Sequence, residues 1–292
     1  MNKEKILKAG KIASGAKKYA RTIAKKGTTL LEIAEKIETK IIELGGKPAF
    51  PVNLSIDDVA AHYTPSYDDK TIAHGLLKID LGIHVDGWIA DTAFSIDLEN
   101  NEENKRLILA SELALKAASE KIKFNVNNNE IGKEIEEAIS SGEISPIINL
   151  SGHGMEQYEL HSGITIPNIN NHQQLPLKEG LYAIEPFTTN GAGKVYDGRD
   201  SGIYELVSER NIRSGSARQL LDYIIKEYKT LPFCSRWIIK KLGTASMLGL
   251  KQLKANGNLH EFPILMESGH GKVAQTENTF FVTKNELIIT SE

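Results

Sequence analysis

The stretch Lys78-Ile-Asp-Leu-Gly-Ile-His-Val-Asp-Gly-Trp-Ile-Ala-Asp91 alternates apolar and polar residues on both sides of Asp86-Gly87. This pattern predicts a β-hairpin that closes on a two-residue turn. In such a hairpin Gly82 faces Asp91, and Asp80 points to the same face as Gly82 because strand side chains alternate with a period of two. The two carboxylates are then diagonal cross-strand neighbours, with Cβ atoms roughly 7 Å apart.

Two carboxylates at that distance repel each other unless a cation lies between them. The hairpin alone therefore leaves two interpretations open. Asp80 and Asp91 are either two solvated acids on the surface of a sheet or one half of a metal site.

The composition is that of a globular enzyme. The chain has 292 residues, 40% of them hydrophobic, which is enough for one large domain or one domain with an insert. A net charge of −3 gives no bulk attraction to nucleic acid or to anionic membranes. The single cysteine, Cys234, excludes an intramolecular disulfide and fits a reducing compartment. No apolar run approaches the roughly 20 residues that span a bilayer.

The spacing of apolar residues predicts an α+β fold with an interruption. Residues 3–26 have the period of an amphipathic helix, and a single arginine with few serines favours a core-packed helix over a transit peptide, hence a cytoplasmic protein. Further helices are expected at 29–44, 101–124 and 129–141, and strands at 147–150, 159–166, 181–185, 202–207, 262–266, 272–282 and 286–290. Three short helices at 216–229, 235–242 and 244–256 interrupt the sheet. We expect an inserted helical subdomain at 209–260 within a catalytic domain formed by 1–208 and 261–292.

Acidic residues and histidines recur in the strand-rich segments. A lone histidine such as His153 in Ser151-Gly-His-Gly is more often a hydrogen-bonded structural residue than a ligand. Glu185 in Tyr182-Ala-Ile-Glu-Pro and Glu277 before Phe280 are more informative, because burial of an unpaired carboxylate is costly. Acids that recur inside apolar strands indicate a cation.

In order and spacing, these motifs resemble the type II methionine aminopeptidases, the archaeal and eukaryotic branch of the pita-bread metallopeptidases. The resemblance covers essentially the whole chain. It implies a pseudo-twofold antiparallel sheet flanked by helices, with a winged-helix-like insert, and removal of the initiator methionine before small second residues. The motifs that carry it are Pro48–Asn53, Ala60–Pro65, Lys78–Asp80, Ile89–Thr92, Asn149–His153, Leu160-His161, Ala183–Phe187 and Ala274–Glu277.

The resemblance also implies a site with two divalent metal ions. Asp80 would bind one ion, His153 and Glu185 the other, while Asp91 and Glu277 would bridge them. Four carboxylates and one imidazole suit Mn, Fe or Co, with Zn as a further option, and the lack of thiolates argues against a structural zinc site.

Further residues match the family's substrate site. The resemblance implies that His62 contacts the nitrogen side of the scissile bond and that His161 donates to the carbonyl oxygen as charge develops there. Glu185 would carry the proton to the leaving amine. Phe50 and Leu160 are candidates for the methionine pocket.

The sequence departs from the family pattern at one position. Asn278 follows Glu277 where the family commonly has histidine, which puts the tuning of Glu277 in doubt. The remaining histidines match no family site and are interpreted as structural or solvated: His74, His84, His172, His260 and His270.

Two alternative functions stay open. One is a peptidase for X-Pro bonds, although such enzymes usually carry an additional N-terminal domain that this chain lacks. The other is a non-catalytic binding protein of the same fold, although such proteins lose ligand residues and this chain keeps all five. The expected partners are nascent chains and peptides with N-terminal methionine, and a monomer without membrane contact is expected.

The predicted insert differs in charge from the rest of the chain. Ten basic against three acidic residues give 209–260 a net charge of +7, so the remainder carries −10. The insert is either a solvated lid over the cleft or a face that also approaches ribosomal RNA.

Overall fold

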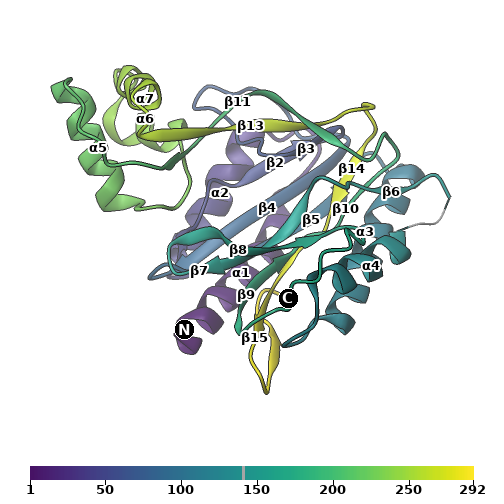
Figure 1. The fold of residues 1–292 in the computed structure, drawn as a ribbon. Helices are drawn as coiled ribbons and strands as arrows, with labels where there is room; N and C mark the ends of the chain where they lie inside the picture. The colour runs from purple at the N-terminus through teal and green to yellow at the C-terminus, as the bar shows by residue number, and fades with distance from the viewer. Residues whose placement is uncertain (140–141) are drawn as a thin grey trace.

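The computed structural model describes residues 1–139 and 142–292 of the chain. Its helices and antiparallel strands confirm the α+β prediction (Figure 1). The helices are α1 (Lys3–Ile23), α2 (Leu30–Glu43), α3 (Glu102–Lys121), α4 (Asn128–Ile139), α5 (Gly215–Glu227), α6 (Ser235–Leu242) and α7 (Ser246–Ala255). The strands are β1 (Lys47–Pro48), β2 (Asn53–Ile56), β3 (Val59–Ala61), β4 (Leu76–Val85), β5 (Trp88–Asp97), β6 (Ser145–Pro146), β7 (Ser151–Glu156), β8 (Glu159–Pro167), β9 (Gly180–Ile184), β10 (Phe187–Thr189), β11 (Val195–Leu206), β12 (Phe233–Cys234), β13 (Leu259–Glu267), β14 (Val273–Gln275), β15 (Asn278–Val282) and β16 (Leu287–Ile289).

The β4–β5 hairpin has the predicted register. Val85 pairs with Trp88, and Gly82 pairs with Asp91. The turn residues Asp86 and Gly87 have φ values of 51° and 81°, the positive values that a two-residue turn requires at both positions. The alternation seen in the sequence therefore places Asp80 and Asp91 on one face of the sheet.

Each of two sheets is covered by a pair of helices (Figure 1). The β1–β4–β2 sheet, extended by β5, packs its apolar side on α1 and α2. The sheet with the order β16–β15–β9–β7–β8 contributes to a second core with α3 and α4. The sheets meet where the backbone of Ala93 in β5 exchanges hydrogen bonds with Glu277. That junction brings β5 beside the start of β15.

Helix ends follow the expected chemistry. The Thr29 side chain accepts a hydrogen bond from the backbone N–H of Glu32, as an N-cap does. The predicted helix 129–141 is observed to Ile139, and residues 140–141 of that prediction lie outside the described part of the chain. The strand expected at 147–150 is wrong. Those residues form a turn in which Asn149 holds Val195 through its side chain, and the strand begins at Ser151.

Helices α5, α6 and α7 lie beyond one end of the long β11–β13 ribbon (Figure 1). They enclose a separate apolar core together with the ribbon's end, where Leu206 pairs with Leu259. Within the described residues, no helix is both long enough and apolar enough to cross a membrane.

Candidate active site

One cavity of about 360 Å³ opens where the two sheets meet. All nine residues singled out from the sequence line it, although they come from segments far apart in the chain. They are Phe50, His62, Asp80, Asp91, His153, Leu160, His161, Glu185 and Glu277.

The five candidate metal ligands come from five different strands or strand ends. Asp80 lies in β4, Asp91 in β5 and His153 in β7, while Glu185 directly follows β9 and Glu277 directly precedes β15. Strand pairing brings the last three together, because β9 pairs with both β7 and β15. The antiparallel register therefore assembles a cluster that sequence distance does not reveal.

The candidate ligand atoms lie close to one another but beyond hydrogen-bond distance. His153 Nε2 lies 3.8 Å from Asp91 Oδ2 and 3.6 Å from Glu185 Oε1. Asp91, His153 and Glu277 each offer one ligand atom, and these atoms lie within 4.8 Å of one another. Direct hydrogen bonds would be shorter, so the spacing leaves room for an ion between the groups.

Several carboxylate oxygens in this cluster are buried and lack a hydrogen-bond partner among the described residues. They are Asp80 Oδ1, Asp91 Oδ1 and both oxygens of Glu277. Buried polar atoms are normally satisfied, because an unmade hydrogen bond costs the full desolvation of the group. Hard divalent cations bind such oxygens, so the residues present fit the metals that the sequence implies.

The electrostatics of the metal-free site follow from burial and mutual repulsion. Burial raises the pKa of Asp80 to about 7. Burial, followed by repulsion from the neighbouring carboxylates, raises the pKa values of Asp91, Glu185 and Glu277 well above their ordinary range. Burial lowers the pKa of His153 to about 4, which keeps the imidazole neutral and able to bind a metal.

The other two histidines face the same cavity. The ring of His161 stands edge-on to that of His153, with centroids 4.5 Å apart. Nδ1 of His62 lies 3.2 Å from the carbonyl oxygen of Pro263. Burial lowers the pKa values of both His62 and His161, and nearby imidazoles lower that of His161 further. Both rings are therefore neutral near pH 7. His161 can donate one hydrogen bond, whereas His62 donates from Nδ1 to Pro263 and presents Nε2 as an acceptor.

Sequence reasoning missed Gln275 and Lys17, which contact the candidate ligands or the residues beside them. Gln275 Nε2 donates to Glu185 Oε2 at 3.2 Å. Lys17 Nζ donates to Asn278 Oδ1 and to Thr92 Oγ1, both at 3.0 Å. Gln275 and Asn278 were visible beside Glu277 in the sequence, but only the fold shows their partners.

The doubt about Asn278 now has a structural answer in part. The side-chain oxygen of Asn278 accepts a hydrogen bond from the Lys17 ammonium. A histidine at this position could accept that bond only in the tautomer whose unprotonated nitrogen faces Lys17. Thr92 Oγ1 in turn donates to the Glu277 carbonyl oxygen at 2.8 Å. Burial and the nearby Arg21 lower the pKa of Lys17 to about 8, so it still carries a proton near pH 7.

The candidate methionine pocket depends on a glycine. A Cβ atom added to Gly82 would lie 2.2 Å from Cε1 of Phe50, so the Phe50 ring rests directly on the β4 backbone. Leu160 belongs to the same small apolar cluster as Phe50. The five other histidines do not line this cavity: His84 is buried and accepts from the Gly87 N–H, while His74, His172, His260 and His270 are exposed.

Comparison with known proteins identifies the family. A model of metallopeptidase family M24 matches residues 4–284. The chain belongs to metallopeptidase family M24. It is 45% identical over 297 residues to a methionine aminopeptidase of Pyrococcus abyssi, with all of both chains covered. It is 46% identical over 292 residues to a methionine aminopeptidase of Methanocaldococcus jannaschii, covering 99% of this chain and 98% of that relative.

A solved structure extends the comparison to the fold. Methionine aminopeptidase from Thermotoga maritima aligns with a TM-score of 0.70 and 20% identity, covering 99% of this chain and 96% of that one. This likeness confirms the pita-bread fold. The full-length M24 relatives support removal of N-terminal methionine by a metallopeptidase that acts on peptides.

Proposed function

We propose that this M24 chain hydrolyses the first peptide bond of peptides and nascent proteins that begin with methionine, with preference for small second residues. The convergence of two buried and two half-buried carboxylates and one neutral imidazole beside two further neutral histidines carries the proposal. That set of groups serves metal-assisted hydrolysis better than any binding role, because it is costly to bury without a cation.

We propose that two divalent ions, Mn, Fe or Co with Zn as a further option, are held by the five acidic and imidazole side chains. Asp80 would hold one ion, His153 and Glu185 the other, and Asp91 and Glu277 would bridge them. When bound, the ions would supply Lewis acidity and activate water at neutral pH.

The chain's own residues would orient the substrate and move the proton. His161, neutral and at the cavity edge, would donate to the scissile carbonyl oxygen, where negative charge develops. His62 would contact the nitrogen side of the bond. Gln275 holds one oxygen of Glu185. Glu185 would also take a proton and deliver it to the leaving amine.

The apolar part of the cavity would select the first residue. Phe50 and Leu160 would contact the methionine side chain. Phe262 and Ile203 also line the cavity and would confine the second residue. This arrangement supports a preference for small residues after methionine.

Methionine release tests the proposal. The protein is stripped with a chelator, reloaded with Mn, Fe, Co or Zn, and assayed with Met-Ala-Ser, Met-Leu-Ser and Ala-Pro-Ser. We expect release from Met-Ala-Ser, little from Met-Leu-Ser, and none after Asp91→Asn. Cleavage of Ala-Pro-Ser instead would establish the X-Pro alternative. Inactivity with every metal, despite two bound equivalents, would establish the binding protein.

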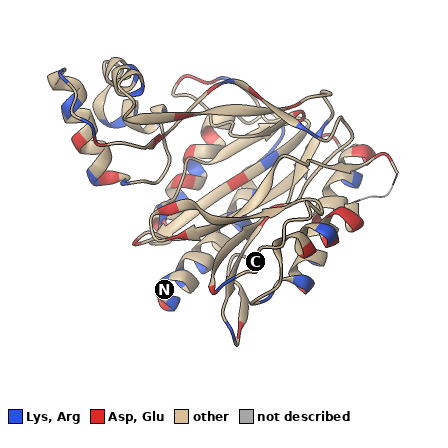
Figure 2. Cartoon of the chain, viewed as in Figure 1, with Lys and Arg blue, Asp and Glu red and all other residues tan. Residues whose placement is uncertain are grey.

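We further propose a cytoplasmic monomer whose residues 209–260 form a distinct subdomain. The separate apolar core of α5–α7 supports that division, and the buried thiol of Cys234 fits a reducing compartment. Basic residues lie along the helices of the insert (Figure 2). Contact of the insert with ribosomal RNA is a narrower proposal, because some of these cations are already paired. Lys240 binds Glu35, and Lys254 binds Asp200 and Glu261.

The remaining exposed cations of the insert allow a clean test of RNA contact. Lys241 and Lys251 are exposed and form no salt bridge with the described residues. We expect Lys241→Glu/Lys251→Glu to weaken co-sedimentation with ribosomes and to reduce its salt dependence. Lys8→Glu/Lys11→Glu, an exposed pair on α1, is the matched control. Equal behaviour of all three proteins would leave only a lid.

A further inference from the structure

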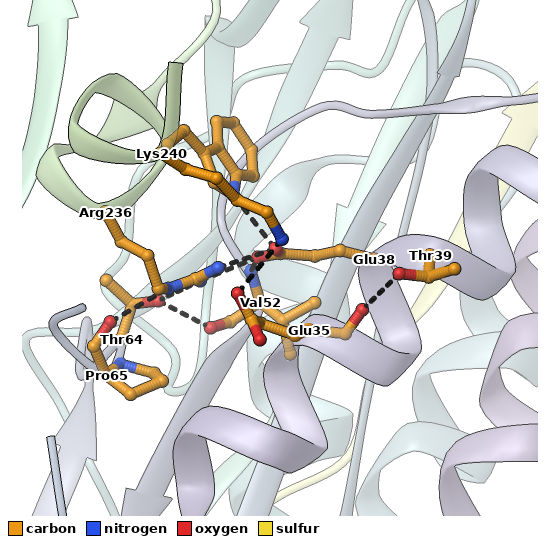
Figure 3. Close-up of polar contacts among 9 residues, drawn as sticks. Glu35, Glu38, Thr39, Val52, Thr64, Pro65, Arg236 and Lys240 are labelled. Atoms are coloured by element: carbon orange, nitrogen blue, oxygen red, sulfur yellow. Dashed lines mark hydrogen bonds and ion pairs between the residues drawn. The ribbon is translucent and has the colours of Figure 1, made fainter. Parts of the chain in front are cut away.

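Arg236 is a basic residue of the insert (residues 209–260) that does not face solvent. It lies in the first turn of α6 and is only 2% exposed. Its Nη1 donates to Glu38 Oε2 at 2.7 Å and its Nη2 to Glu38 Oε1 at 2.8 Å (Figure 3). The guanidinium therefore binds the Glu38 carboxylate of α2 in a bidentate manner, the geometry in which an arginine–carboxylate pair is strongest.

Each oxygen of Glu38 accepts a second hydrogen bond. Oε1 accepts from the backbone N–H of Val52 at 3.3 Å, and Oε2 accepts from Trp237 Nε1 at 2.9 Å. Glu38 is 7% exposed. The buried charge is thus fully compensated, and it joins helix α2, helix α6 and the segment before β2.

The other side of the guanidinium holds the segment after β3. Arg236 Nε donates to the carbonyl oxygen of Pro65 at 3.0 Å, and Nη2 also lies 3.4 Å from Thr64 Oγ1 (Figure 3). Thr64 Oγ1 donates to the carbonyl oxygen of Val52 at 2.9 Å. Val52, Glu38, Arg236 and Thr64 therefore form a closed ring of hydrogen bonds.

Two segments fastened by this ring lead directly into the cavity. His62 lies two residues before Thr64 and has a φ of 63°, a conformation that is strained for a residue with a side chain. Phe50 lies two residues before Val52 and rests on Gly82. A strained backbone persists only where its surroundings fix it, and the ring supplies such an anchor immediately after His62.

We propose that Arg236 is a positioning residue, through which the insert fixes the backbone that carries His62 and Phe50 in the substrate cavity. The inference rests on the proposed peptidase function. It assigns the insert a role in catalysis at a distance from the reacting atoms, since Arg236 itself does not line the cavity. A displacement of about 1 Å at a substrate-positioning group can cost about 10²-fold in rate.

The test separates positioning from simple stabilisation. Glu38→Met/Arg236→Met removes both charges together, because a buried pair replaced by apolar residues of similar size often leaves stability unchanged. The matched control is Glu35→Met/Lys240→Met, an exposed pair that joins the same two helices at 3.1 Å. Each protein is examined for thermal stability, metal stoichiometry by calorimetry, and kcat and KM on Met-Ala-Ser. Amide hydrogen exchange is followed over residues 49–65.

We expect the Glu38/Arg236 variant to bind as much metal as the parent, to exchange faster at 49–65, and to lose 10- to 100-fold in kcat/KM. The loss should divide between a higher KM, from Phe50, and a lower kcat, from His62. The control should stay within twofold of the parent. A folded, metal-loaded double variant with kcat/KM and exchange within twofold of the control would overturn the proposal.

A second variant covers a failure to fold. Arg236→Lys keeps the charge beside Glu38, but one ammonium cannot reach both carboxylate oxygens and Pro65 together. We expect three- to tenfold lower kcat/KM at unchanged metal content, and parent-like values would overturn the proposal. If the parent releases no methionine with any metal, the proposed function fails. The exchange of residues 49–65 then still decides whether Arg236 fixes that segment.

Discussion

Replacement of Asp80 by asparagine should stabilise the metal-free protein while it removes a metal ligand. Asp80 lines the cavity with three other carboxylates, and its buried Oδ1 lacks a partner in the described part of the chain. Asparagine has nearly the same shape and carries no charge. The substitution therefore removes the cost of placing a charge in this buried site, and it removes the repulsion that Asp80 exerts on Asp91, Glu185 and Glu277.

The magnitude follows from the pKa of Asp80. A folded-state pKa of about 7, against an ordinary value of 3.8, means that ionised Asp80 lowers the free energy of unfolding by about 4 kcal/mol above pH 7. Asp80 is partly exposed, and solvent screening reduces that figure, so we expect about 2 kcal/mol. Because the folded pKa is raised, this contribution to stability is complete below pH 3.8 and is lost as pH rises through about 7. The parent without metal should thus be less stable at pH 8 than at pH 5.

Urea unfolding followed by circular dichroism measures the effect at pH 5 and pH 8, after chelator treatment and again with Mn. We expect Asp80→Asn to raise the unfolding free energy at pH 8 without metal, and to lose most of the stabilisation that Mn gives the parent. The control, Asp86→Asn, changes the exposed acid of the same hairpin, which binds Lys5. A metal-free Asp80→Asn protein no more stable than the parent at pH 8 would refute the argument.

Other substitutions test the remaining groups of the site. His153→Ala should lower metal content and activity together, whereas His161→Ala should keep both metals and reduce turnover about 10²–10³-fold, as metal analysis beside kcat will show. Activity should fall on the acid side as protons displace metal from the carboxylates and His153, and an acid-inactivated sample with full metal content would contradict this. Gly82→Ala should raise KM at least tenfold, since its methyl group would displace the Phe50 ring, and unchanged KM would remove Phe50 from the pocket. Lys17→Met should weaken metal binding measured by calorimetry, because it leaves the oxygens behind the site without their donor.

Local patterns in the sequence predicted the elements that depend on neighbours in the chain. The Asp86-Gly87 turn predicted the β4–β5 register, and the helices expected at 29–44 and 101–124 are observed at Leu30–Glu43 and Glu102–Lys121. The strand predicted at 147–150 was wrong. Its apolar residues suit a strand, but the Asn149 side chain forms hydrogen bonds with the backbone of Val195, and the segment forms a turn. Periodicity cannot report a partner that lies elsewhere in the sequence.

The candidate site was predictable as a list of residues but not as an arrangement. Family resemblance named Glu185 and Glu277, and only the pairing of β9 with β15 explains their proximity. Arg236 counted as one of ten surface cations in the insert. No local signal marked it as buried, because its partner Glu38 lies on a helix almost 200 positions earlier. Ion pairs between residues far apart in the chain cannot be predicted from a single sequence.

The junction between β5 and β15 has a consequence for how the chain reaches its native state. The five candidate ligands are spread from Asp80 to Glu277, and contacts between such distant residues form late because closing long loops costs entropy. A partly folded chain therefore presents separate carboxylates rather than a chelating set. Ions would bind tightly only after both sheets have joined. Metal binding would therefore stabilise correctly folded molecules selectively and leave misfolded ones open to degradation.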